Sequence, residues 1–196
     1  MSKLKNISDQ AAGKAAMVAG TAFAAEGVVQ LVHPQNSGSK VVGLAGHLVI
    51  SFFIVALITM APAVIALGRY ARPGRAEKIA SAVAASTTLL GLTSITSLAM
   101  SHDGVWFNVI APLTNAVWLF GSIALAVSLK RAGRVATAIA VGLPVAWIGT
   151  IPMATVGGGL ISGAYFLTLG YLLAQDALAP VGARAAMKPR FRGAAS

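Results

Sequence analysis

The stretch "AAGKAAMVAGTAFAAEGVVQLVHPQ", residues 11–35, decides the fold of this chain. A helix that spans a membrane needs about 20 largely apolar residues, and small and apolar residues fill this stretch for about that length. Polar residues interrupt it at Glu26, Gln30 and His33, which follow one another at helical spacing before Pro34. The stretch therefore predicts a membrane-spanning helix that also carries a polar site.

The composition of the whole chain indicates an apolar environment. Of its 196 residues, 57% are hydrophobic and 10% are charged, whereas soluble domains contain roughly 25% charged residues. A water-soluble domain of this size could not hide so much apolar surface, but a protein dissolved in lipid has no need to hide it. We therefore expect an all-α, polytopic membrane protein.

Cysteine content and charge exclude several classes of function. The chain has no cysteine, which excludes disulfides, thiol catalysis and cysteine-ligated zinc or iron–sulfur centres. The net charge of +10 would suggest nucleic acid as a partner of a soluble protein. Because the cations fall mostly at the ends of apolar runs, we assign them to membrane topology and to membrane lipids, and we expect no nucleic-acid partner.

Six apolar segments predict a bundle of six transmembrane helices. They cover residues 15–33, 41–67, 79–100, 105–129, 135–153 and 157–175. The turn between the last two segments carries no charge; we place it there because residues 135–175 are about twice the length of one span. This organisation gives an N-terminal cytoplasmic segment (1–14), a six-helix domain (15–176) and a basic cytoplasmic tail (177–196).

The basic residues predict the orientation of the bundle. With six spans, fourteen of the fifteen lysines and arginines fall at one end, and Lys40 falls at the other. Positive charges are retained on the cytoplasmic side, so both termini are predicted to be cytoplasmic. We expect a multi-pass protein of the bacterial cytoplasmic membrane, with which the alanine- and glycine-rich composition is compatible. A cleaved signal peptide is disfavoured, because the apolar core at 17–21 is short and contains glycine.

Small residues are abundant inside the predicted helices, especially in 11–25 and 157–170. Small residues three or four positions apart allow helices to approach closely in lipid. We favour packing within the chain. A docking face for a partner subunit, or for a second copy in a homo-oligomer, is the alternative.

The predicted topology gathers polar side chains at the outer end. Glu26, Gln30 and His33 share one helical face, with Glu26 about 10 Å deeper than His33, and His47 enters from the next helix. A charge at that depth is costly, so Glu26 should face the bundle or a wet cavity. A carboxylic acid beside an imidazole can donate and accept protons. We therefore predict an acid/base site of Glu26, His47 and His33.

Other polar residues are predicted to bind a substrate: Gln30, His102, Asp103, Asn108, Asn115 and Trp118. Each has a structural alternative. Glu26 could be hydrogen-bonded to the many hydroxyls of segment 79–100. His33 and His102 could be ordinary interfacial residues, and Asp103 a helix cap.

No metal site or cofactor is predicted. The three histidines with Met100 and Met153 could suit Cu(I), but their spacing matches no known ligand motif. The sequence contains no facing histidine pair for haem, no paired carboxylates for magnesium–diphosphate chemistry and no Walker pattern.

Three classes of function stay open. The first is an enzyme in which Glu26, with His47 or His33, transfers protons during cyclisation, isomerisation or hydrolysis of a lipid- or isoprenoid-like substrate. The second is a small-molecule uptake or binding subunit, because six helices with both termini inside are similar in layout to the substrate-capture subunits of vitamin importers. The third is a membrane scaffold or immunity protein without a pocket.

Overall fold

A computed structural model describes residues 8–34, 40–71 and 74–178. These residues form six α-helices and one short 3-10 helix, and no β-strand: α1 (Asp9–Val32), α2 (Gly43–Tyr70), α3 (Arg75–Met100), α4 (Phe107–Ala132), α5 (Thr137–Thr150), η2 (Ala154–Val156) and α6 (Gly159–Ala174). The all-α architecture and the six helices predicted from the sequence are confirmed. Half of the predicted N-terminal segment 1–14 and nearly all of the tail 177–196 lie outside the described residues.

At two helix boundaries, the difference from the predicted position has a local physical reason. α1 begins at Asp9, because Ser8 caps it: the Ser8 Oγ accepts a hydrogen bond from Ala11 N at 3.1 Å, and an acid in the first turn interacts favourably with the helix dipole. α5 ends at Thr150, short of the predicted 153, where Pro152 has no N–H to continue the helix.

α1 to α4 are each long and apolar enough to cross a membrane. α5 and α6 are shorter, with 14 and 16 residues. The hairpin of α5, η2 and α6 nevertheless follows α1 from Gly13, which lies against Gly170, to Leu31, which lies against Gly157. The 18 positions between Gly13 and Leu31 correspond to about 27 Å of helix, close to the ~30 Å hydrocarbon core of a bilayer.

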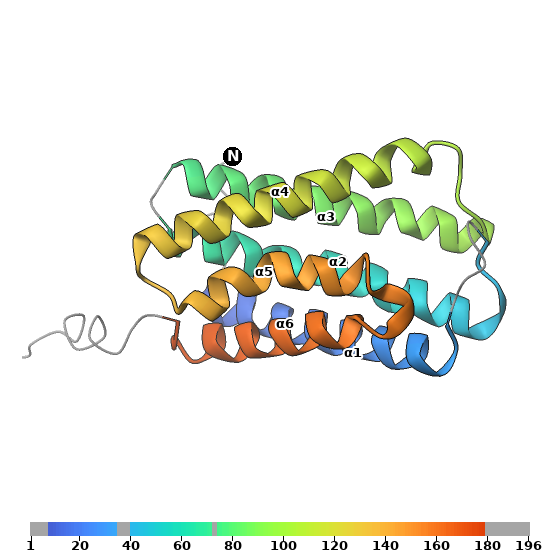
Figure 1. The fold of residues 1–196 in the computed structure, drawn as a ribbon, viewed down its shortest axis with the longest axis horizontal. Coiled ribbons are helices and arrows are strands. Elements are labelled where there is room, and N and C mark those ends of the chain that lie inside the picture. Colours follow the sequence, from blue (N-terminus) through green and yellow to red (C-terminus); the bar gives the residue numbers. More distant parts are fainter. Residues whose placement is uncertain (1–7, 35–39, 72–73, 179–196) are drawn as a thin grey trace, which may run out of the picture.

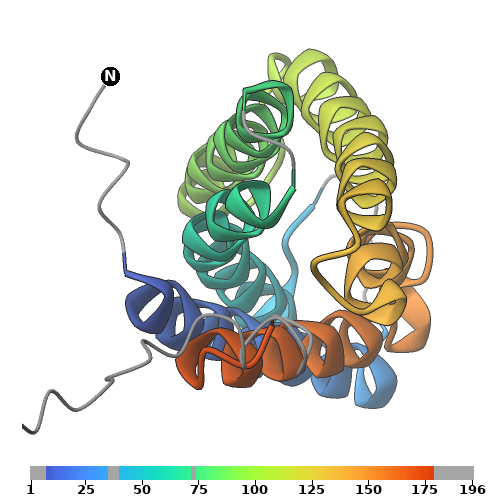
Figure 2. The same ribbon diagram turned by 90° about the vertical axis from the view of Figure 1, so that its left-hand side faces the viewer.

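The helices form a closed ring in which sequence neighbours run antiparallel, as the end-on view shows (Figures 1 and 2). Each helix packs on the next along the chain, and α1 packs most extensively on α6. The two ends of the ring differ chemically. We call the end with the α2–α3 and α4–α5 turns the basic end, because it carries Arg69, Arg75 and Arg131. The opposite end, with His33 and His102, is the histidine end.

Glycine makes the contact between α1 and α6 possible. A Cβ added to Gly20 would lie 2.6 Å from Leu167 N and 2.8 Å from Gly163 O, a distance that no real side chain tolerates. The same contact repeats along both helices, with Gly13, Gly20 and Gly27 of α1 facing Gly170, Gly163 and Gly159 of α6. In lipid, such close packing is a principal source of helix association. The small residues of these two helices thus pack within the chain.

We expect Gly20→Ala to destabilise the bundle. The added methyl would meet backbone atoms of α6 at 2.6–2.8 Å, and overpacking of this kind costs about 1–3 kcal/mol. That cost exceeds the gain of about 1 kcal/mol in helix propensity. The measurement is the free energy of unfolding of the purified protein in detergent.

Val28→Ile is the matched control, because it also adds one methyl group to α1, but on its exposed side. It should change stability by less than about 0.5 kcal/mol. Equal stability of the Gly20→Ala and Val28→Ile variants would mean that the α1 and α6 backbones are not in contact.

Candidate functional site

Glu26 faces the interior of the ring. It lies six residues before the end of α1 at Val32, which places it about 9 Å from the histidine end. Its side chain is 3% exposed and that of Gln30, one turn later, is 5% exposed, whereas Val28 and Leu31 on the other side of α1 are about half exposed. In the last two turns of α1, the polar side chains of Glu26 and Gln30 are therefore turned inward and those of Val28 and Leu31 outward.

The Glu26 carboxyl group forms no hydrogen bond or ion pair in the described part of the chain, and its Oε2 is fully buried. Most of the α3 hydroxyls considered as its partners are used elsewhere. Those of Ser86, Thr87, Thr93 and Ser94 donate to carbonyl oxygens of α3 itself at 2.8–3.1 Å. A buried polar group without a partner costs about 1–3 kcal/mol, so this carboxyl group does not serve stability.

The three histidines lie at the same end as Glu26, but none is hydrogen-bonded to it. His47 is half-buried in α2, with its Nδ1 2.7 Å from the Gly43 carbonyl oxygen of the same helix. This bond requires a proton on Nδ1, so Nε2 of a neutral ring is the proton acceptor. His33 is exposed at the end of α1, and His102 is exposed with its Nδ1 3.1 Å from the Asp103 carbonyl oxygen. The predicted acid and imidazoles are thus gathered at one end without forming a hydrogen-bonded pair.

Two of the predicted substrate-binding residues, Asn115 and Trp118, pack between helices, whereas Asp103 and Asn108 lie at the histidine end. Asn115 links α4 to α5: its Nδ2 donates to the Ala111 carbonyl oxygen at 2.9 Å, and its Oδ1 accepts from Trp147 Nε1 at 3.2 Å. Trp118 is completely buried in α4. Asp103 is half-buried in the α3–α4 turn, and Asn108 is exposed. Asn108 therefore does not point into the bundle beside Asn115.

Further unpaired groups lie in the interior; the sequence predicted Trp118 as a site residue, but not Ser97 or Ser122. Ser97 Oγ on α3, and Trp118 Nε1 and Ser122 Oγ on α4, are buried and have no hydrogen-bond partner among the described residues. Ser122 follows Trp118 by four positions on the same helical face, a spacing that could have revealed it. Buried polar atoms are normally paired with protein, water or ligand. With Glu26, these atoms give the interior several open hydrogen-bonding positions.

The buried hydroxyls between α5 and α6, unlike the unpaired groups above, have hydrogen-bond partners. Ser162 Oγ donates to the Ala146 carbonyl oxygen at 2.7 Å and lies 2.8 Å from Thr150 Oγ1, which also donates to Ala146 at 2.9 Å. These buried hydroxyls are satisfied and hold two helices together. The open positions belong instead to α1, α3 and α4.

A groove of about 520 Å³ lies between the end of α1 and the start of α2. Valine and leucine side chains of both helices line it, and His33 closes one side. Glu26 is not among the lining residues, so the groove leads to the histidine end without reaching the carboxyl group. Within the described ranges, no three His, Asp or Glu side chains cluster as they would to hold a metal ion.

Comparison with protein-family models, curated proteins and solved structures finds no match to this chain. The chemistry of the site is therefore inferred from its own residues.

We expect Glu26→Met to stabilise the protein. Methionine fills a similar volume without a polar group that needs a partner, so stability should rise by about 1–3 kcal/mol. The measurement is again detergent unfolding of the purified protein.

Ser162→Ala is the comparison, since it removes a buried polar group that has partners. It should lower stability by about 1 kcal/mol. If Glu26→Met destabilised the protein to the same degree as Ser162→Ala, the carboxyl group would be a structural element and not a site.

Proposed function

We propose that the chain is an integral protein of a bacterial cytoplasmic membrane, with its basic end in the cytoplasm. Large apolar side chains exposed on the outside of the bundle support this, among them Val109 and Phe120 at 70% and 68% exposure. So does the distribution of cations. Within the described ranges, Lys40 lies at the histidine end, whereas arginines and lysines crowd the opposite end, the pattern of the positive-inside rule.

Single cysteines test this orientation cleanly, because the chain has none of its own. In intact bacterial cells, a membrane-impermeant maleimide should label Val105→Cys, in the α3–α4 turn, and should not label Arg134→Cys, in the α4–α5 turn. Lysis should make both accessible. Labelling of Arg134→Cys but not Val105→Cys in intact cells would reverse the topology.

Within the membrane, we propose that the protein is an acid/base enzyme acting on a hydrophobic small molecule that is dissolved in the bilayer. The observation that carries the proposal is the Glu26 carboxyl group, buried near one end of the ring without a partner. An ionised carboxylate is costly in such surroundings, so the group is suited to hold a proton and to deliver it to a substrate.

Residues at the histidine end can donate and accept the protons that the proposed reaction moves. Glu26 donates a proton to a double bond, carbonyl oxygen or leaving group, and it regains one from the resulting cation or from water. His47, through its Nε2, or His33 accepts or relays that proton during turnover. Cyclisation and isomerisation need no further reactant, and hydrolysis needs one water molecule.

The uptake-subunit alternative is less favoured for a specific reason. It would use a small-residue face of α1 to dock a partner subunit, but the glycines of α1 already lie against α6. A scaffold without a pocket is also less favoured, because it would gain nothing from an unpaired buried acid.

Glu26→Gln tests the enzyme directly in the native cell. Glutamine keeps the size of the side chain but cannot act as an acid, and general acid/base catalysis contributes about 10²–10⁴-fold in rate. In organic extracts analysed by mass spectrometry, a pair of hydrophobic compounds, isomeric or differing by one water, should change in ratio by about 100-fold or more.

Glu77→Gln is the matched control, since it makes the same substitution at the basic end, and it should leave the ratio unchanged. A wild-type protein that instead purifies with a water-soluble molecule, or with an energising subunit, would establish the uptake alternative. An unchanged extract for Glu26→Gln would exclude Glu26 as a catalytic residue.

A further inference from the structure

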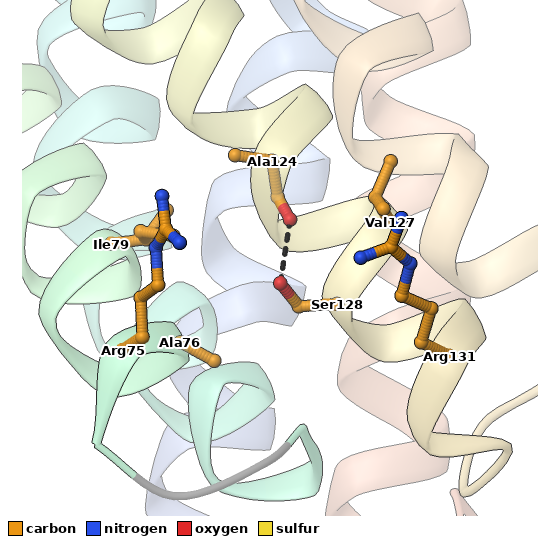
Figure 3. A pocket seen from close by; sticks show the side chains of 7 residues that line it. All are labelled: Arg75, Ala76, Ile79, Ala124, Val127, Ser128 and Arg131. Atoms are coloured by element: carbon orange, nitrogen blue, oxygen red, sulfur yellow. Dashed lines mark hydrogen bonds between the residues drawn. The ribbon is translucent and has the colours of Figure 1, made fainter.

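A cleft of about 590 Å³ opens at the basic end between the first turns of α3 and the last turns of α4 (Figure 3). Its lining includes Arg75 and Ile79 from α3, and Ala124, Val127, Ser128 and Arg131 from α4. The cleft lies at the opposite end of the bundle from the Glu26 site and shares no residue with it.

Two arginines on opposite sides of this cleft have no acidic partner. Figure 3 shows Arg75 on one side, Arg131 on the other and Ser128 between them. Neither guanidinium group forms an ion pair with a described residue, whereas Arg69 at the same end is paired with Asp9 at 3.2 Å. Glu77 lies two positions after Arg75 in the first turn of α3, and side chains two positions apart do not face each other on a helix.

The backbone adds to the positive potential of the cleft. α3 begins at Arg75 without a side-chain cap, so the N–H groups of its first turn are free to attract an anion. The carbonyl groups that end α4 are partly neutralised, because Gly133 N donates to Leu129 O and Lys130 O at 3.2 Å. Two guanidinium groups therefore flank one volume beside the start of α3, and phosphate is one of the anions that arginine binds in two-point geometry.

The rest of the cleft is apolar. Ile79, Ala124 and Val127 line it beside the arginines, and Gly121 lies against Val83 one turn further into the bundle. α3 and α4 have 26 residues each, about 39 Å of helix. They exceed the ~30 Å hydrocarbon core, so their terminal turns reach the depth of lipid headgroups. Guanidinium groups beside apolar side chains fit an amphiphile and not a free ion.

We propose that this cleft binds one anionic phospholipid of the cytoplasmic leaflet, with its phosphate between Arg75 and Arg131 and an acyl chain along Ile79 and Val127. Ser128 favours a headgroup that can donate a hydrogen bond. Its hydroxyl donates to the Ala124 carbonyl oxygen at 2.8 Å, so its oxygen accepts a further hydrogen bond, as a glycerol headgroup would donate. This inference rests on the proposed membrane location but is independent of Glu26.

The test uses the full-length protein in mild detergent, with phosphatidylglycerol and phosphatidylcholine as probes. Native mass spectrometry should show one phosphatidylglycerol retained per chain in preference to phosphatidylcholine. Arg75→Gln combined with Arg131→Gln should weaken phosphatidylglycerol binding by about tenfold or more, since two charge-assisted contacts are lost. Lys78→Gln combined with Arg134→Gln removes the same charge at the same end outside the cleft lining, and it should change binding by less than about twofold.

Several outcomes would overturn the proposal. One is equal loss of binding in the two double variants, which would indicate general attraction to a basic surface. Another is no preference for phosphatidylglycerol in the wild-type protein. Competition by millimolar glycerol phosphate or inorganic phosphate would indicate a site for a soluble phosphate.

Thermal unfolding of each variant without added lipid controls for folding. The cysteine-labelling experiment reports separately on membrane location.

Discussion

The contact between the glycines of α1 and α6 is the constraint on which the rest of the structure depends. It joins the first helix to the last and so converts a row of six helices into a ring. It also fixes the rotation of α1 about its axis. Residues advance by about 100° per position along a helix, so with Gly27 against α6, both Glu26 and Gln30 fall on the side that faces the interior. Val28 falls on the opposite side and is exposed.

The polar groups inside the ring fall into two sets, those with hydrogen-bond partners and those without. Hydroxyls between α5 and α6, and most of those on α3, are hydrogen-bonded within the protein. Glu26, Ser97, Trp118 and Ser122 are buried without a hydrogen-bond partner in the part of the chain that the structure describes. Stability alone would favour apolar residues at such positions, and a chain that keeps polar ones gives up stability where function requires it. The unpaired groups therefore mark the part of the bundle where chemistry is to be sought.

Periodicity and composition were sufficient to predict the helices and the clustering of the histidines at one end, because span length and charge placement are local properties of a sequence. Side-chain partners were not predictable in this way. His47 bonds to its own helix, and Asn108 faces outward, because the rotation of each helix is set by contacts with others. Arg75 and Arg131 are 56 positions apart, and they share a cleft because α3 and α4 are neighbours. From the sequence alone, both were assigned only in general terms to membrane topology and to membrane lipids.

The joining of the first helix to the last also has a consequence for biosynthesis. α1 leaves the ribosome first, but the surface that its glycines recognise is made last. Throughout translation, the glycine face of α1 is available to any other membrane segment with a matching small-residue face. The newly made chain is therefore most exposed to mispairing before α6 is inserted, and a factor that shields α1 during that interval would act as its chaperone.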